Sequence, residues 1–75
     1  MPIVISNLIK SLRVKKGFSQ SDVAKLMGLA RPTYNRKEIG KVPFTIEEGK
    51  QLAVILESSF EEIFLNENVT QTNYL

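Results

Sequence analysis

Three glycines divide the first forty residues of the chain into short segments. Gly17 and Gly28 each follow a stretch in which apolar residues recur at helical spacing, and Gly40 closes a further predicted helix. Glycine is the usual residue just after a helix, because it adopts the left-handed backbone conformation without strain. No segment alternates polar and apolar residues as a strand does. The punctuation therefore predicts an all-α fold of short helices joined by tight turns.

Serine and threonine mark where most of these helices begin. Ser6, Ser19, Thr45 and Ser59 are candidate N-caps, and all except Ser6 have an acidic residue three positions later, the pattern of a capping box. The predicted helices cover residues 6–15, 20–27, 31–39, 46–56 and 60–64. We therefore expect one domain over residues 1–65, followed by a polar C-terminal tail over residues 66–75.

The predicted core comes from apolar residues on one side of each helix. The candidates are Ile5, Leu8, Ile9 and Leu12, then Val23, Ala24, Leu26 and Met27, then Ile46, Leu52, Ala53, Ile55 and Leu56. Chains of 75 residues often need a disulfide, a metal or a partner subunit for stability. Because there is no cysteine and no histidine, we expect neither disulfide nor metal site, which makes a homodimer the remaining support.

The same composition argues against catalysis and against a membrane protein. Histidine and cysteine chemistry is excluded, no glycine-rich phosphate loop is present, and the paired glutamates at 47–48 and 61–62 belong to helix starts. We expect no enzyme activity and no cofactor. No apolar run is long enough to cross a bilayer and no signal peptide is indicated, so a cytoplasmic location is expected.

Charge is distributed unevenly along the chain. All ten lysines and arginines lie within residues 1–50 beside four acidic residues, which gives this part a net charge of +6. Residues 51–75 contain four glutamates and carry −4. This polarity suits a basic face turned toward a polyanion, although ordinary solvated helix faces would give it equally well.

The helices at 20–27 and 31–39 form a helix-turn-helix pattern, since only Gly28, Leu29 and Ala30 separate them. In such motifs the second helix enters the major groove of DNA. On a helical wheel, one side of the second helix contains Ala30, Tyr34, Lys37 and Glu38, the other contains Pro32, Asn35, Arg36 and Ile39, and Arg31 and Thr33 flank the latter. Arginine and asparagine are side chains that read guanine and adenine, so the second side is the candidate DNA-reading face.

From about residue 6 to residue 65 the chain resembles the lambda-repressor/Cro-like helix-turn-helix (XRE) family. The resemblance is carried by Lys16 to Gln20, Val23-Ala24, Met27 to Leu29, Arg31, Thr33-Tyr34, Arg36, Glu38, Gly40-Lys41, Pro43, Ile46, Leu52-Ala53, Leu56 and Ser59 to Phe64. Around Tyr34, Lys37-Glu38 and Phe44-Thr45 the chain is similar to small regulators of phages and mobile elements in Gram-positive bacteria. The resemblance implies a compact five-helix, lambda-repressor-like DNA-binding domain.

The resemblance also implies roles for individual residues. Arg31, Pro32 and Arg36 would contact bases, with Thr33 and Asn35 beside bases or phosphates, Gln20 on the DNA backbone, and Lys41 and Lys16 near phosphates. Arg13 and Glu38 would form a partly buried ion pair that fixes the angle of the recognition helix.

Four positions depart from the family pattern. Pro32 replaces a polar residue and can offer only an apolar contact, for example to a thymine methyl group. Ala30 replaces a serine or threonine N-cap, and Lys37 replaces an apolar residue, so its stem is expected to run over the core toward solvent. Ile39 is apolar where a polar residue is usual.

These features predict a Cro-like or minimal transcriptional repressor that occupies a partly palindromic operator in double-stranded DNA as a homodimer. Because eleven residues follow Phe64, no small-molecule effector module is expected. The candidate dimer surface contains Phe60, Ile63, Phe64, Leu65, Val69, Tyr74 and Leu75, although the first four would serve equally well to cap the core. The alternatives are the antitoxin of a toxin–antitoxin pair, an excisionase-like or architectural protein, and a helical protein–protein interaction module.

Overall fold

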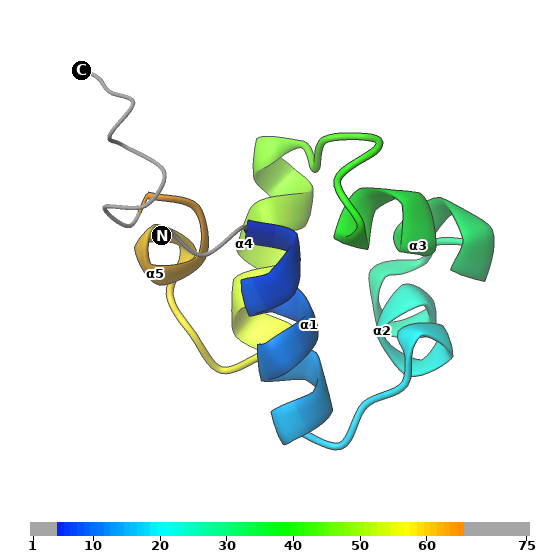
Figure 1. Cartoon of the computed structure of the whole chain (residues 1–75), viewed down its shortest axis with the longest axis horizontal. Coiled ribbons are helices and arrows are strands. Elements are labelled where there is room, and N and C mark those ends of the chain that lie inside the picture. The colour runs from blue at the N-terminus through cyan, green and yellow to red at the C-terminus, as the bar shows by residue number, and fades with distance from the viewer. Residues whose placement is uncertain (1–4, 66–75) are drawn as a thin grey trace.

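In the computed structural model, which describes residues 5–65, the chain forms five helices and no strand within that range. They are α1 (Ile5–Lys15), α2 (Gln20–Met27), α3 (Arg31–Glu38), α4 (Ile46–Ile55) and α5 (Phe60–Phe64) (Figure 1). The predicted all-α, five-helix, lambda-repressor-like fold is confirmed. The predicted tail over residues 66–75 lies outside the described residues.

Three helices begin at the predicted capping boxes. At α2, Ser19 Oγ accepts a hydrogen bond from the Asp22 amide at 3.0 Å, and Asp22 Oδ2 accepts one from the Ser19 amide at 2.8 Å. Thr45 with Glu48 and Ser59 with Glu62 repeat this exchange at α4 and α5. Ser6 was the exception among the predicted N-caps. It lies inside α1, which begins at Ile5, so its predicted capping role is wrong; no acidic residue three positions later supported it.

The predicted glycine terminators adopt the backbone conformation expected of them. Gly17, Gly28 and Gly40 have φ angles of 82°, 73° and 87°. At Gly28 this turn allows the Leu29 amide to donate a 2.8 Å hydrogen bond to the Ala24 carbonyl. Including the turn at Gly28, only three residues separate α2 from α3, so the two helices of the motif pack on each other.

The core contains residues from all five helices. Its buried apolar members are Ile9, Val23, Ala24, Met27, Tyr34, Leu52, Ala53, Leu56 and Ile63. Two predicted members are wrong, since Leu26 is 56% exposed and Ile46 is 68% exposed, and the side chain of a third, Ile5, lies outside what the structure describes. Leu26 lies beside, rather than on, the narrow stripe that α2 buries. Ile46 has the spacing of the buried stripe of α4, but it is the first residue of that helix, and periodicity does not tell how far neighbouring helices extend.

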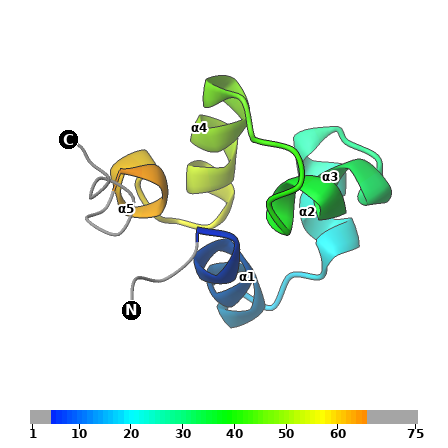
Figure 2. The ribbon, with the colours of Figure 1, turned by 45° about the horizontal axis from the view of Figure 1, so that its top comes forward.

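The predicted recognition helix α3 and the acidic helix α5 lie at opposite ends of the molecule. α2 packs on α3 and α4, while α1 packs on α3 and α5. In both ribbon views α3 and α5 lie at opposite ends with α1 and α4 between them (Figures 1 and 2). The predicted recognition helix is therefore far from the acidic α5.

The candidate dimer residues of α5 have different environments. Ile63 is completely buried and belongs to the core, so it offers no surface to a partner. Phe60 and Phe64 are half-buried and contact each other with ring centroids 5.0 Å apart. Leu65 is 53% exposed, and it is the one of these four that remains available for a contact. The other three candidates, Val69, Tyr74 and Leu75, lie outside the described residues.

Candidate nucleic-acid interface

Helix α3 has one buried and one exposed side. Tyr34 is completely buried and Glu38 is 2% exposed, whereas Arg31, Pro32 and Arg36 are exposed. Thr33 and Asn35 are half-buried, and Lys41, just beyond the helix, is exposed. The helical wheel thus assigned these sides correctly. Ala30 is an error on the wheel: it is exposed, because it is the N-cap residue with an extended backbone and does not follow helical geometry.

The start of α3 has no side-chain cap. Ala30 makes no capping hydrogen bond, as expected from its methyl side chain, and Pro32 lies in the first turn. Proline has no amide hydrogen to satisfy there, and its fixed φ suits a helix start. The N-terminal end of the recognition helix is therefore defined by backbone conformation and by packing on α2.

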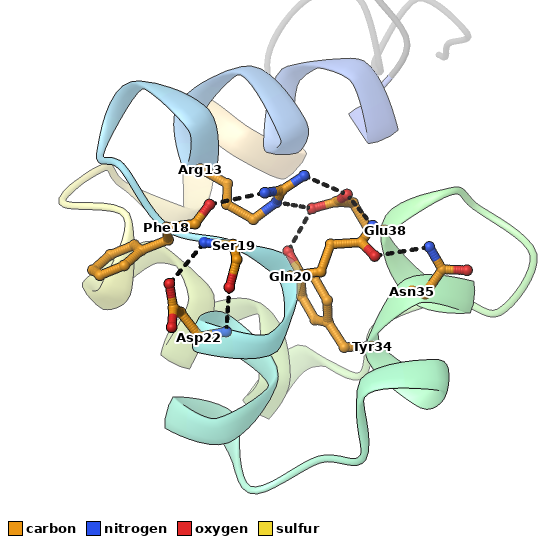
Figure 3. A network of polar contacts seen from close by, with 8 residues as sticks. All are labelled: Arg13, Phe18, Ser19, Gln20, Asp22, Tyr34, Asn35 and Glu38. Carbon is orange, nitrogen blue, oxygen red and sulfur yellow. Dashed lines mark hydrogen bonds and ion pairs between the residues drawn. The ribbon is translucent and has the colours of Figure 1, made fainter.

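The ion pair implied by the family resemblance is present between α1 and α3. Arg13 Nε lies 2.7 Å from Glu38 Oε2, and Arg13 Nη2 donates to Glu38 Oε1 at 3.2 Å (Figure 3). A third donor of the same guanidinium, Nη1, bonds the carbonyl oxygen of Phe18 at 2.8 Å. Arg13 thereby joins the end of α3 to α1 and to the segment that precedes α2.

Glu38 accepts hydrogen bonds from two further side chains. Gln20 Nε2 donates to Oε1 and the Tyr34 hydroxyl donates to Oε2, both at 2.8 Å (Figure 3). Burial by itself would raise the pKa of Glu38, but the hydrogen bonds from Arg13, Gln20 and Tyr34 and the guanidinium charge outweigh it and hold that pKa below the ordinary value of a glutamate. Burial and the bond to the carboxylate raise the pKa of Tyr34. Glu38 is therefore an ionised carboxylate that accepts a hydrogen bond from the neutral phenol of Tyr34.

Gln20 and Asn35 extend this network toward the exposed side of α3. Gln20 Oε1 accepts a hydrogen bond of 3.1 Å from Asn35 Nδ2, and both side chains are half-buried. The sequence did not predict this contact, because the two residues are fifteen positions apart and on different helices. The bond from Tyr34 to Glu38 had a local signal, namely their spacing of four residues on one helix.

The expected DNA contacts fall into two groups in the structure. Gln20 and Asn35 are brought together with the ion pair. Arg31, Arg36 and Lys41 instead form no ion pair with any residue of the described part of the chain. Their charges remain available to a polyanion. Lys16 differs from them, since its ammonium lies 2.8 Å from Glu57 Oε1.

Lys37 corrects one expectation. Its stem was predicted to run over the core toward solvent; the side chain is only 10% exposed, and its ammonium ends on protein acceptors near the surface rather than free in solvent. Nζ lies 2.9 Å from Glu48 Oε1 and 3.3 Å from the Pro43 carbonyl oxygen. Glu48 is the capping-box residue of α4. Its pKa is lowered mainly by the hydrogen bond from the Thr45 amide and to a smaller extent by Lys37. Lys37 thus fastens the end of α3 to the start of α4.

Comparison with known proteins identifies the family. The HTH_3 family, described as helix-turn-helix, matches residues 9–63. The chain belongs to this family. No curated protein sequence matches the HTH_3 domain described here.

Solved structures provide the closer comparison for this HTH_3 domain. It is similar to the master regulator for biofilm formation SinR in complex with DNA, with a TM-score of 0.74 and 25% identity over 84% of this chain and 100% of that one. A SinR/SinI protein complex gives a TM-score of 0.76 at 25% identity, over 95% of this chain and 68% of that one. An HTH_3 transcriptional regulator from Vibrio cholerae is 33% identical with a TM-score of 0.69, over 85% of this chain and 36% of that one.

The HTH_3 domain is thus related to DNA-binding transcription regulators. Two further findings concern other classes of protein. Over residues 5–65, no helix has the length and apolar character needed to span a membrane. In the same range, no three acidic side chains are grouped as metal ligands would be.

Proposed function

We propose that this HTH_3 domain is a sequence-specific transcription regulator that occupies an operator in double-stranded DNA with α3 in the major groove. One observation carries the proposal. Arg36 is exposed on the side of α3 opposite Tyr34 and Glu38, which anchor the helix in the core, and Arg31 is exposed at its first residue. A helix held in this way presents its two arginines in a fixed position, which is what reading of base edges requires.

The exposed residues of α3 then have separate roles. Arg31 and Arg36 each have the planar donor pattern that binds the O6 and N7 atoms of guanine. Pro32 lies between them in sequence and offers an apolar surface to a thymine methyl group. Thr33 and Asn35, which are half-buried, lie at the edges of this face beside bases or phosphates.

Phosphate contacts are assigned to residues around the motif. Gln20 opens α2 and uses one remaining side-chain N–H, because its other polar contacts are with Glu38 and Asn35. Lys41 is exposed and free of ion pairs within the described residues. Lys16 is the weaker candidate, since Glu57 partly neutralises it.

The proposal includes a homodimer on a palindromic site. The small size of the domain and the exposure of Leu65, the C-cap residue of α5, support an assembly through the α5 end, which lies opposite α3 (Figure 1). Two such subunits would place their recognition helices in successive major grooves, about 34 Å apart along one side of the DNA. The similarity to SinR in complex with DNA supports the choice of double-stranded DNA as the ligand.

Selection of bound duplexes from a random library tests this function. We expect strong enrichment of one motif with two-fold symmetry, and an affinity that falls steeply with salt because several phosphates are neutralised. Absence of any enriched motif, even at low salt, would contradict the proposal and favour a helical protein–protein interaction module instead. The SinR/SinI complex is the observation that keeps this second candidate open.

A further inference from the structure

We propose that Asn35 contacts DNA as a hydrogen-bond acceptor, and that a chain of hydrogen bonds beginning at Glu38 turns its carbonyl oxygen outward. The inference rests on the proposed function and deepens it, since it names the kind of base edge that this position selects. It concerns a residue that was expected only to lie near bases or phosphates.

The chain begins with a group that can only accept. An ionised carboxylate has no hydrogen to donate, and the contacts of Glu38 with Arg13 and Tyr34 keep it ionised and buried. Any carboxamide placed against it must therefore turn its NH₂ group inward. Gln20 lies in that position, with Nε2 at 2.8 Å from Glu38 Oε1.

The orientation of Gln20 fixes that of Asn35. With its NH₂ group facing Glu38, Gln20 presents Oε1 to its other neighbour, and an oxygen there requires a donor. Asn35 supplies Nδ2 at 3.1 Å. Its own oxygen, Oδ1, consequently faces away from the network, as the close view shows (Figure 3). Within residues 5–65 no donor bonds this oxygen.

An outward oxygen selects a particular class of base. In the major groove, adenine N6 and cytosine N4 donate hydrogen bonds, whereas guanine O6 and thymine O4 only accept them. An Asn35 side chain that was free to rotate would present either end of its amide. Held by Gln20, it favours the orientation of a base pair that places the major-groove amino group, adenine N6 or cytosine N4, beside it rather than a carbonyl oxygen. Turning the Asn35 amide around would place its Oδ1 against Gln20 Oε1. Turning the Gln20 amide around as well would place Gln20 Oε1 against the Glu38 carboxylate, again oxygen against oxygen.

The test compares base preferences of the full chain and of three variants by selection from a random duplex library. Asn35→Ala removes the contact. Gln20→Met removes the relay but keeps a side chain of similar length, so Asn35 becomes free to rotate. Arg31→Ala is the matched control on the same helix. Ratios of base preference are compared, because Gln20→Met also removes a phosphate contact and lowers affinity for all sequences alike.

We expect one position in each half-site at which the wild-type protein prefers the base whose major-groove amino group faces Asn35. Because every base pair has one such amino group, on adenine or on cytosine, the preference is assigned by replacing that base with an analogue that lacks the group, purine for adenine or pyrimidin-2-one for cytosine. Wild-type binding should weaken with the analogue and binding of Asn35→Ala should not. Asn35→Ala should weaken that preference roughly 5- to 100-fold. Gln20→Met should relax the same position by at least about fivefold while leaving the position that depends on Arg31 unchanged. Circular dichroism of each variant verifies that it folds. If Gln20→Met does not fold, Asn35→Ala still tests the contact on its own.

Three results would overturn the inference. Removal of the amino group at the position that depends on Asn35 could leave wild-type binding unchanged, no position could respond to Asn35→Ala, or a folded Gln20→Met protein could keep the wild-type preference. If the wild-type protein selects no sequence at all, the proposed function fails as well. That failure is recognised before any variant is compared.

Discussion

Glu38 Oε2 lies 2.7 Å from Arg13 Nε, so the last residue of the recognition helix is bound to the first helix of the domain through a contact that is almost fully buried. Because Tyr34 and Gln20 bond the same carboxylate, one side chain connects α1, α2 and α3. The position of α3 on the body of the protein therefore depends on Glu38, although this residue does not face the proposed DNA ligand.

Replacing Glu38 should destabilise the fold strongly. In Glu38→Ala the guanidinium of Arg13 stays buried without its carboxylate, a situation that typically costs about 3–5 kcal/mol. Urea denaturation followed by circular dichroism measures the loss. Lys16→Ala is the control, since it breaks the ion pair with Glu57, whose side chain is 74% exposed, and should cost at most about 1 kcal/mol. Equal stability of Glu38→Ala and the wild-type protein would refute the structural role of the pair.

Stability should decrease in acid. Folding lowers the pKa of Glu38 through its hydrogen bonds with Arg13, Gln20 and Tyr34, and it lowers the pKa of Glu48 through the Thr45 amide and Lys37. Groups whose pKa is depressed by folding stabilise the protein above their ordinary pKa, and this contribution is lost as the pH falls through the lowered values. The free energy of unfolding should therefore be steady near neutrality and fall as the pH drops below the ordinary pKa of a glutamate. Denaturation curves at pH 7, 5, 4 and 3 measure it, with constant stability down to pH 3 as the contrary result.

Gly49→Ala should weaken the packing of α5 on α4 and lower the stability of the fold. A Cβ atom at this buried position would lie 2.8 Å from Phe60 Cε1 and 3.1 Å from Phe64 Cε2. Alanine favours a helix by up to about 1 kcal/mol, but displacing packed rings typically costs about 1–3 kcal/mol, so we expect a net loss of about 1 kcal/mol. The same substitution in a Phe60→Ala background is the control. There it should cost less, because only the 3.1 Å contact with Phe64 remains, and an equal loss in both backgrounds would show that the contact with Phe60 is not the cause.

Arg31→Ala and Arg36→Ala should alter specificity without altering stability. Each should reduce binding to the selected site by about 1–3 kcal/mol and relax preference at one base pair of each half-site. Lys41→Ala should instead weaken binding to all sequences alike and reduce the slope of log K against log salt by about one. Lys50→Ala, an exposed substitution on α4, is the control and should change neither quantity. Uniform weakening by both arginine variants would contradict base reading.

The features of the fold that depend on residues close together in the sequence were predicted correctly. The starts at Ser19, Thr45 and Ser59 follow from capping boxes, whose members are three residues apart. The burial of Tyr34 and Glu38 follows from helical periodicity. Leu26 and Ile46 were misplaced, because periodicity identifies a stripe but not its width or how far the neighbouring helices cover it.

The contacts of the candidate site could be predicted only in part. The pairing of Arg13 with Glu38 came from family resemblance and not from spacing. The bonds of Gln20 to Glu38 and Asn35 join residues that only the packing of α2 on α3 brings together. The same holds for Lys37, whose partner Glu48 lies on the next helix. Sequence reasoning identified the residue types of the site, while the polarity of its hydrogen bonds required the structure.

Methylation interference tests the central claim, that α3 reads the major groove, most directly. Duplexes of the selected site would be methylated sparingly at guanine N7, in the major groove, and at adenine N3, in the minor groove, and then separated into bound and free fractions. We predict that N7 methylation within each half-site prevents binding and that N3 methylation of the base pairs beneath α3 does not. Binding that tolerates N7 methylation throughout the site would contradict the account.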